Sequence, residues 1–90
     1  MNIYVFRAEA AQKTMYVFRP GTDNPEEAMK NLGYKPIQHL KVNSNQRLSD
    51  MLAQANPSVG DIIKIRTPDM IAYYAHMFSG YMEIKTLFPR

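Results

Sequence analysis

The sequence predicts a small single α+β domain, mostly an antiparallel sheet, with an N-terminal hairpin and two short helices. Segments rich in β-branched and aromatic residues, which favour strands, alternate with two helical segments, one indicated by its capping residues and one by apolar residues at helical spacing. The length of 90 residues suits one folded domain, which we expect to span residues 1–90. A composition of 46% hydrophobic and 21% charged residues is typical of globular proteins and not of disordered ones.

The first predicted element is a β-hairpin in residues 2–19. The tetrad Tyr-Val-Phe-Arg occurs at residues 4–7 and again at 16–19, and a short polar and alanine-containing segment joins the two copies. Because strand side chains alternate between two faces, we expect the aromatic residues on one face and the arginines, Arg7 and Arg19, on the other. The aromatic face would carry Tyr4, Phe6, Tyr16 and Phe18.

A short helix is predicted next. Asp23 or Asn24 is the expected N-cap, because its side-chain oxygen can accept a hydrogen bond from a free backbone N–H, and Pro25 suits the first helical position. We expect this helix to end at Gly33, since glycine readily takes the left-handed conformation that closes helices. Residues 36–42 alternate weakly between apolar and polar types and could form a strand or an extended connection.

The second predicted helix has the clearest helical pattern in the chain. Four apolar residues at helical spacing form one stripe, which we expect to face the core. Ser44 or Asn45 would cap its start, and Asn56-Pro57 would end it, because proline cannot continue a helix. The stripe consists of Leu48, Met51, Leu52 and Ala55.

The C-terminal third is predicted to be rich in strands. In residues 62–66, isoleucines alternate with Lys64 and Arg66, so these two basic side chains are expected to share a face. Residues 68–79 fit a helix, because apolar residues recur at helical spacing, but they also fit the return strand of a hairpin. Residues 81–87 alternate again and predict a last strand.

Residues 58–81 resemble part of a known family. Their order of Ser-Val-Gly-Asp-Ile-Ile, then Ala-Tyr-Tyr, then Phe-Ser-Gly-Tyr is similar to that of the YodL-like domain. Gly60 stands where that family usually has a serine, and His76-Met77 where an acidic residue is common. The resemblance favours a hairpin over residues 61–77. It also implies a small non-enzymatic module of a phage or mobile genetic element, one that binds a host bacterial protein and inhibits or modulates it by covering its surface.

The predicted contact surface lies in the tyrosine-rich segment near the C terminus. Tyrosine and methionine are enriched at protein interfaces, because they combine a large contact area with a polar or adaptable end. A hairpin that buries one face of this segment would leave the alternate side chains on the other face. These predicted partner-binding residues are Tyr74, His76, Phe78 and Tyr81. The alternative is that another element covers the second face too, which would make them part of the core.

Binding of single-stranded nucleic acid is the alternative function. Its basic residues would be Arg7, Arg19, Lys64 and Arg66, beside the aromatic face of the N-terminal hairpin. Alternation argues against it, because it places the arginines of the hairpin opposite the rings, whereas nucleic-acid binding needs stacking and charge together. A net charge of +3 is also too small to imply this function.

Enzyme and cofactor signatures are missing from the sequence. It has no nucleophile elbow, glycine-rich phosphate loop, His-Glu-x-x-His pair or cysteine, so we expect no catalytic residues and no cofactor. His39 and His76 with Asp61 or Glu83 could form a two-histidine metal site, but they lack metal-ligand spacing, and no metal is expected. We further expect a cytoplasmic protein with no membrane span, and an unpaired strand edge at either terminus would let two copies pair as a homodimer.

Overall fold

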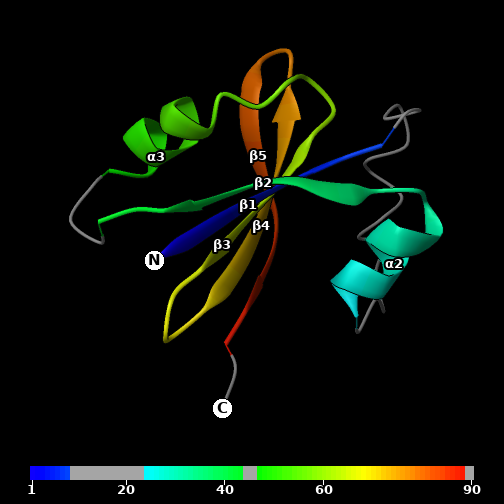
Figure 1. The fold of residues 1–90 in the computed structure, drawn as a ribbon, viewed down its shortest axis with the longest axis horizontal. Helices are drawn as coiled ribbons and strands as arrows, with labels where there is room; N and C mark the ends of the chain where they lie inside the picture. Colours follow the sequence, from blue (N-terminus) through cyan, green and yellow to red (C-terminus); the bar gives the residue numbers. More distant parts are fainter. Residues whose placement is uncertain (9–23, 44–46, 89–90) are drawn as a thin grey trace.

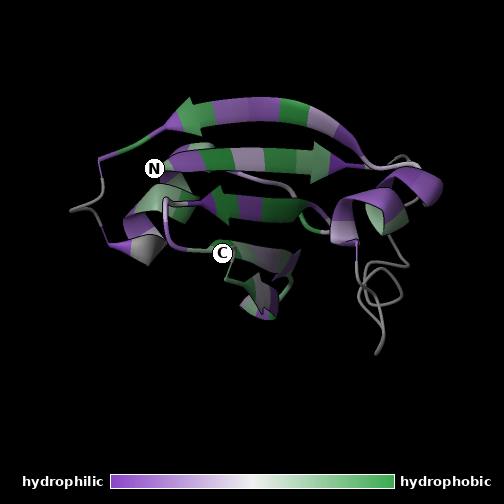
Figure 2. Cartoon of the chain, turned by 90° about the horizontal axis from the view of Figure 1, so that it is seen from below, coloured by the Kyte–Doolittle hydropathy of each residue, from purple (hydrophilic) through white to green (hydrophobic). Residues whose placement is uncertain are grey.

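A computed structural model describes residues 1–8, 24–43 and 47–88 of the chain (Figure 1). Its strands form one antiparallel sheet in the order β2-β1-β3-β4-β5, with two helices packed on it, which confirms the predicted small α+β fold. Figure 2 shows hydrophobic and polar positions alternating along β1 and β3. The elements are β1 (Asn2–Arg7), α2 (Pro25–Asn31), β2 (Lys35–Lys41), α3 (Leu48–Ala55), β3 (Ile62–Arg66), β4 (Ile71–Met77) and β5 (Gly80–Leu87).

The predicted N-terminal hairpin is not confirmed. β1 pairs with β2 along one edge and with β3 along the other, and the second strand predicted for the hairpin, in residues 13–19, lies outside the described residues. β1 carries large apolar side chains on both faces: Ile3 and Val5 on one, Tyr4 and Phe6 on the other. Such a strand removes the most apolar surface from water when it lies in the middle of a sheet with both faces covered, which explains its interior position.

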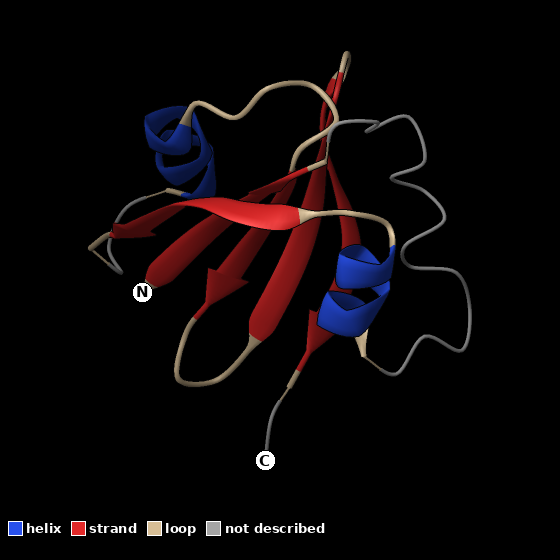
Figure 3. Cartoon of the chain, turned by 45° about the vertical axis from the view of Figure 1, so that its right-hand side comes forward, coloured by secondary structure: helices blue, strands red, loops and turns tan. Residues whose placement is uncertain are grey.

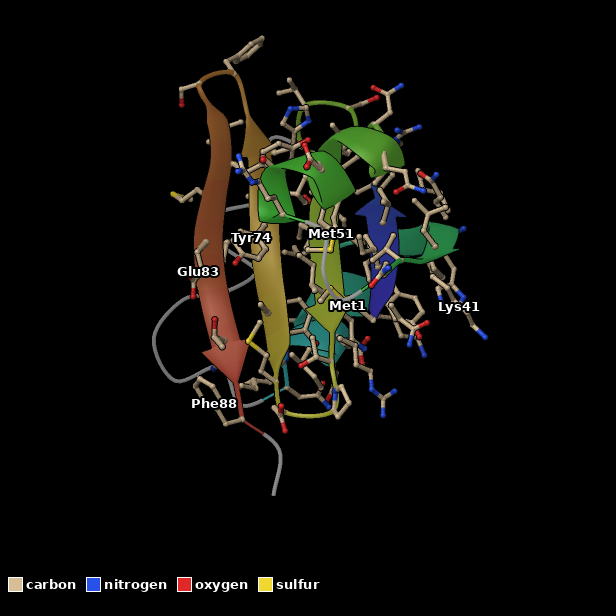
Figure 4. The ribbon with its side chains drawn as sticks, turned by 90° about the vertical axis from the view of Figure 1, so that its left-hand side faces the viewer. Met1, Lys41, Met51, Tyr74, Glu83 and Phe88 are labelled. Carbon is tan, nitrogen blue, oxygen red and sulfur yellow. The ribbon has the colours of Figure 1, made fainter. Side chains whose placement is uncertain are left out.

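Helix α3 covers one face of the sheet (Figure 4). It buries the predicted stripe residues Met51, Leu52 and Ala55 against the isoleucines and valine of β1 and β3. The helix ends as predicted, because Asn56 takes the left-handed conformation at φ 48° just before Pro57. Its start differs: the N-cap is Arg47, with no side-chain cap hydrogen bond, and the predicted caps lie outside the described residues. The buried set from the sheet is Ile3, Val5, Ile63 and Ile65.

Helix α2 covers the opposite face (Figure 3). Its Met29 packs with Ile62 and Tyr73, whereas α3 packs on Ile63, and consecutive residues of a strand point to opposite faces. The predicted cap is confirmed, since the Asn24 side chain accepts a hydrogen bond of 3.1 Å from the Glu27 N–H. The cap therefore fixes the residue at which α2 begins, and the helix packs its apolar side on the sheet.

Residues 71–77 form a strand, so the hairpin alternative for residues 68–79 is confirmed and the helix is wrong. The turn before β4 provides the physical reason. The Thr67 hydroxyl accepts hydrogen bonds from the N–H groups of Asp69 and Met70, and the Thr67 N–H donates to the Met70 carbonyl at 2.9 Å. This side-chain-supported turn reverses the chain before a helix can begin.

Both edge strands of the described sheet carry a bulge. Ile37 of β2 is skipped between the pairs that join β1 and β2, and Ile84 of β5 is skipped between the pairs that join β4 and β5. A bulge bends an edge strand and interrupts its row of hydrogen-bonding groups, which works against pairing with another chain. The homodimer through a strand edge stays a prediction, and these edges do not favour it.

Burial makes Tyr73 sensitive to alkaline pH. Desolvation, with a smaller contribution from the charge of Glu26, raises the pKa of the Tyr73 hydroxyl from 10.0 to about 12. The unfolded chain loses this proton first, so folding stability is expected to hold below pH 10 and to fall as pH rises toward 12, by about 2 kcal/mol. Urea unfolding at a series of alkaline pH values measures the fall. It should be smaller in Tyr73→Phe, and an equal fall in that variant would contradict the assignment.

Candidate functional site

The turn between β4 and β5 forms a projecting tip (Figure 1). Met77 pairs with Gly80, so Phe78 and Ser79 make the connection, and Gly80 adopts φ 126°, a conformation that suits glycine. Phe78 is 97% exposed. A phenyl ring in water contributes nothing to the hydrophobic stabilisation of the fold, so its place at the tip needs another explanation.

Beside Phe78, two further predicted residues lie together. His76 and Tyr81 are cross-strand partners, and their rings stack with centroids 4.6 Å apart. The backbone of His76 also bonds to the turn before β3, accepting from the Gly60 N–H at 2.8 Å, which brings the half-exposed side chain of Val59 to this end of the sheet. We call Val59, His76, Phe78 and Tyr81 the hairpin-tip surface. Val59 was not predicted, because only the fold brings its turn beside the hairpin.

Tyr74, the fourth predicted contact residue, lies on the same face as His76 but not at the tip. It is half-buried and packs against the cluster beneath α3 (Figure 4). Burial, and secondly the neighbouring charge of Glu83, raises the pKa of its hydroxyl. For Tyr74, the alternative that another element covers the second face of the strand is therefore confirmed, since the cluster beneath α3 extends to this residue. At the hairpin tip, Phe78 remains exposed.

Arg7 is part of a structural network. Its Nε donates to Asp61 Oδ1 at 2.9 Å and its Nη2 donates to Asp61 Oδ2 at 2.8 Å and to Ser58 Oγ at 3.0 Å. Asp61 is 1% exposed, and its Oδ2 also accepts from the Ser58 N–H at 2.8 Å. The hydrogen bond and charge of Asp61 raise the pKa of Arg7. The Ser58 and Asp61 side chains thus join the β3 turn to β1.

Lys64 and Arg66 lie on the face of the sheet that carries Tyr4, because β3 pairs directly with β1 and Tyr4 is the partner of Lys64. The geometric objection to nucleic-acid binding therefore does not apply to these two residues, since the pairing brings rings and cations together. Lys64 is buried and its Nζ lies 2.6 Å from Glu26 Oε1, whereas Arg66 is exposed. Arg7 is on the other face, and Arg19 lies outside the described residues.

The candidate metal residues are not brought together. His39 on β2 stacks with Tyr4 on the face of α2, whereas His76 stacks with Tyr81 on the face of α3, and Asp61 is held by Arg7. Within the described ranges, no group of three or more His, Asp or Glu residues could hold a metal ion.

One cavity of about 340 Å³ lies beside α2. Glu26 is the one carboxylate among its described lining residues, and it is paired with Lys64. Its lining residues are Phe6, Glu26, Met29, Lys30, Gly33, Tyr34, Lys35 and Pro36.

No family model, curated protein or solved structure matches this chain. Neither α2 nor α3 has the length and apolar character that crossing a membrane requires.

Proposed function

We propose that this protein is a small non-enzymatic module of a phage or mobile genetic element, which acts in the cytoplasm by binding a host bacterial protein through the hairpin-tip surface. Binding inhibits or modulates the host protein by covering part of its surface. The observation that carries this proposal is the 97% exposure of Phe78 at the end of a projecting hairpin. In interfaces, a few aromatic residues that fill pockets on the partner supply most of the binding free energy.

The surroundings of Phe78 support this role. The stacked rings of His76 and Tyr81 and the exposed Val59 give the anchor a partly apolar rim, which would exclude water around it. Val59, Phe78 and Tyr81 carry no charge at neutral pH, and this surface holds no carboxylate, lysine or arginine among its four residues. We therefore expect the partner to offer an apolar pocket, and the complex to depend little on salt concentration.

Phe78→Ala is expected to weaken binding of the partner by about 30-fold or more, the effect of removing a hot-spot aromatic residue. Phe88→Ala is the matched control, because Phe88 is another exposed phenylalanine, 73% exposed, but it follows the far end of β5. The partner is first isolated by affinity capture from a nuclease-treated bacterial lysate, and its affinity for each purified variant is then measured by calorimetry. Equal weakening by both substitutions would contradict the proposal.

Substitutions of the two nearby tyrosines separate binding from folding. Tyr81→Ala removes part of the rim and should weaken binding with little change in the thermal unfolding temperature. Tyr74→Ala should instead lower that temperature, because Tyr74 packs against the cluster beneath α3. A Phe78→Ala protein that fails to fold would assign Phe78 to the core and overturn the proposed surface.

A further inference from the structure

On the face of the sheet that bears α2, neither of the described helices covers a region near the start of β1, where two rows of side chains cross three strands. His39, Tyr4 and Lys64 form the first row, since Tyr4 is the register partner of the other two. Lys41, Asn2 and Arg66 form the second row, with Asn2 as the shared partner. Residues two apart on a strand share a face, so both rows point to the same side.

The first row is an ordered stack. The rings of Tyr4 and His39 lie 4.4 Å apart at an interplanar angle of 9°, and the Nζ of Lys64 lies over the Tyr4 ring, 5.3 Å from its centroid. A contact of 3.0 Å between His39 Nε2 and Asn2 Oδ1 fixes the imidazole ring in this position. β2 is an edge strand among the described strands and His39 is exposed, so the stack ends in an open aromatic face.

The second row supplies positive charge. Lys41 and Arg66 are both exposed, and no carboxylate in the described part of the chain pairs with either of them. They lie on strands that flank β1, which places their backbones roughly 10 Å apart. Lys64 is neutralised by Glu26, so the net charge of this region comes from the two free cations.

We propose that this region, the edge-stack surface formed by Asn2, Tyr4, His39, Lys41 and Arg66, binds single-stranded nucleic acid. One base continues the stack on the open face of His39, and the backbone phosphates on either side of it lie against Lys41 and Arg66. Stacking on aromatic rings next to cations is the general mode of binding single strands. A duplex hides the faces of its bases, so it cannot use the stack.

The fixed position of the His39 ring favours single-stranded nucleic acid over an acidic protein as the ligand. Two free cations alone would suit any anionic surface, but an acidic peptide makes no use of an open aromatic face held in place by Asn2. The edge-stack surface and the hairpin-tip surface lie on opposite faces, and at opposite ends of the antiparallel strands. This site therefore stands independently of the proposed protein contact.

Fluorescence anisotropy of a labelled single-stranded oligonucleotide of mixed sequence tests the site, with the full-length protein at low salt. His39→Ala should weaken binding by about 5-fold or more, the range for the loss of one stacked base, and His39→Phe should restore it. Arg66→Ala should also weaken binding. In a plot of log affinity against log salt concentration, it should make the negative slope shallower by about 0.7, the value for one phosphate contact on a single strand.

Arg47→Ala is the matched control for net charge, because Arg47 is exposed at the start of α3 on the other face of the sheet. It should leave the salt dependence unchanged, and Phe78→Ala should leave the binding of the oligonucleotide unchanged. Absence of binding at low salt, equal effects of Arg47→Ala and Arg66→Ala, or preference for a duplex would each overturn the proposal.

Discussion

Replacing Asp61 with alanine is expected to lower the free energy of unfolding by about 3 kcal/mol, because hydrogen bonds to a charged group contribute about 1.5–3 kcal/mol each and several are lost together. The Asp61 carboxylate is 1% exposed and accepts from Arg7 Nε, Arg7 Nη2 and the Ser58 N–H. A domain of this size has a total stability of about 5–15 kcal/mol, so the loss is a large part of the whole.

Urea unfolding followed by circular dichroism measures this effect. Asp61→Asn keeps the size of the side chain and one acceptor oxygen, so its loss should be smaller than that of Asp61→Ala. Arg7→Ala should also destabilise, because it leaves the buried carboxylate without its cation. The proposed role of Asp61 is wrong if Asp61→Ala unfolds at the same urea concentration as the wild-type protein.

Replacing Ile63 with alanine is expected to cost about 2–5 kcal/mol, the usual range for removing a buried isoleucine side chain. Ile63 has no exposed surface and lies in the cluster beneath α3. Ile62→Ala should cost a similar amount on the other face, in the cluster beneath α2. The two side chains point to opposite faces and belong to separate clusters, so the double variant should lose more stability than either single variant, about 4–10 kcal/mol, which is a large part of the total stability of a domain of this size.

Ile37→Ala is the matched control for these substitutions. Ile37 is 48% exposed at the bulge of β2, so its replacement should change the free energy of unfolding by less than about 0.5 kcal/mol, as surface substitutions usually do. Equilibrium unfolding in urea measures all four proteins. A double variant as stable as the wild-type protein, or a loss for Ile37→Ala equal to that for Ile63→Ala, would show that the two clusters are not the core.

Some features of the candidate sites could be predicted from local sequence. Alternation in residues 71–77 and the break at Gly80 were compatible with His76, Phe78 and Tyr81 at one hairpin end, but a helix fitted residues 68–79 equally well, and only the pairing of β4 decided between them. Alternation could not show that α3 extends over Tyr74 and stops before the hairpin tip. The second surface depends on the pairing of β1 with β2 and β3, strands that are distant in sequence, so no local pattern indicated that Lys64 and Tyr4 share a face.

Both helices and most strands of this protein follow from local sequence, because caps, turn residues and apolar periodicity act over a few neighbouring residues. Asn24, Pro25 and Gly33 bounded α2, and the stripe around Met51 defined α3. The neighbours of β1, and the choice of which side chains stay in water, became visible only in the folded arrangement. Those outcomes depend on how much apolar surface distant segments bury together, and that total is a property of the whole fold.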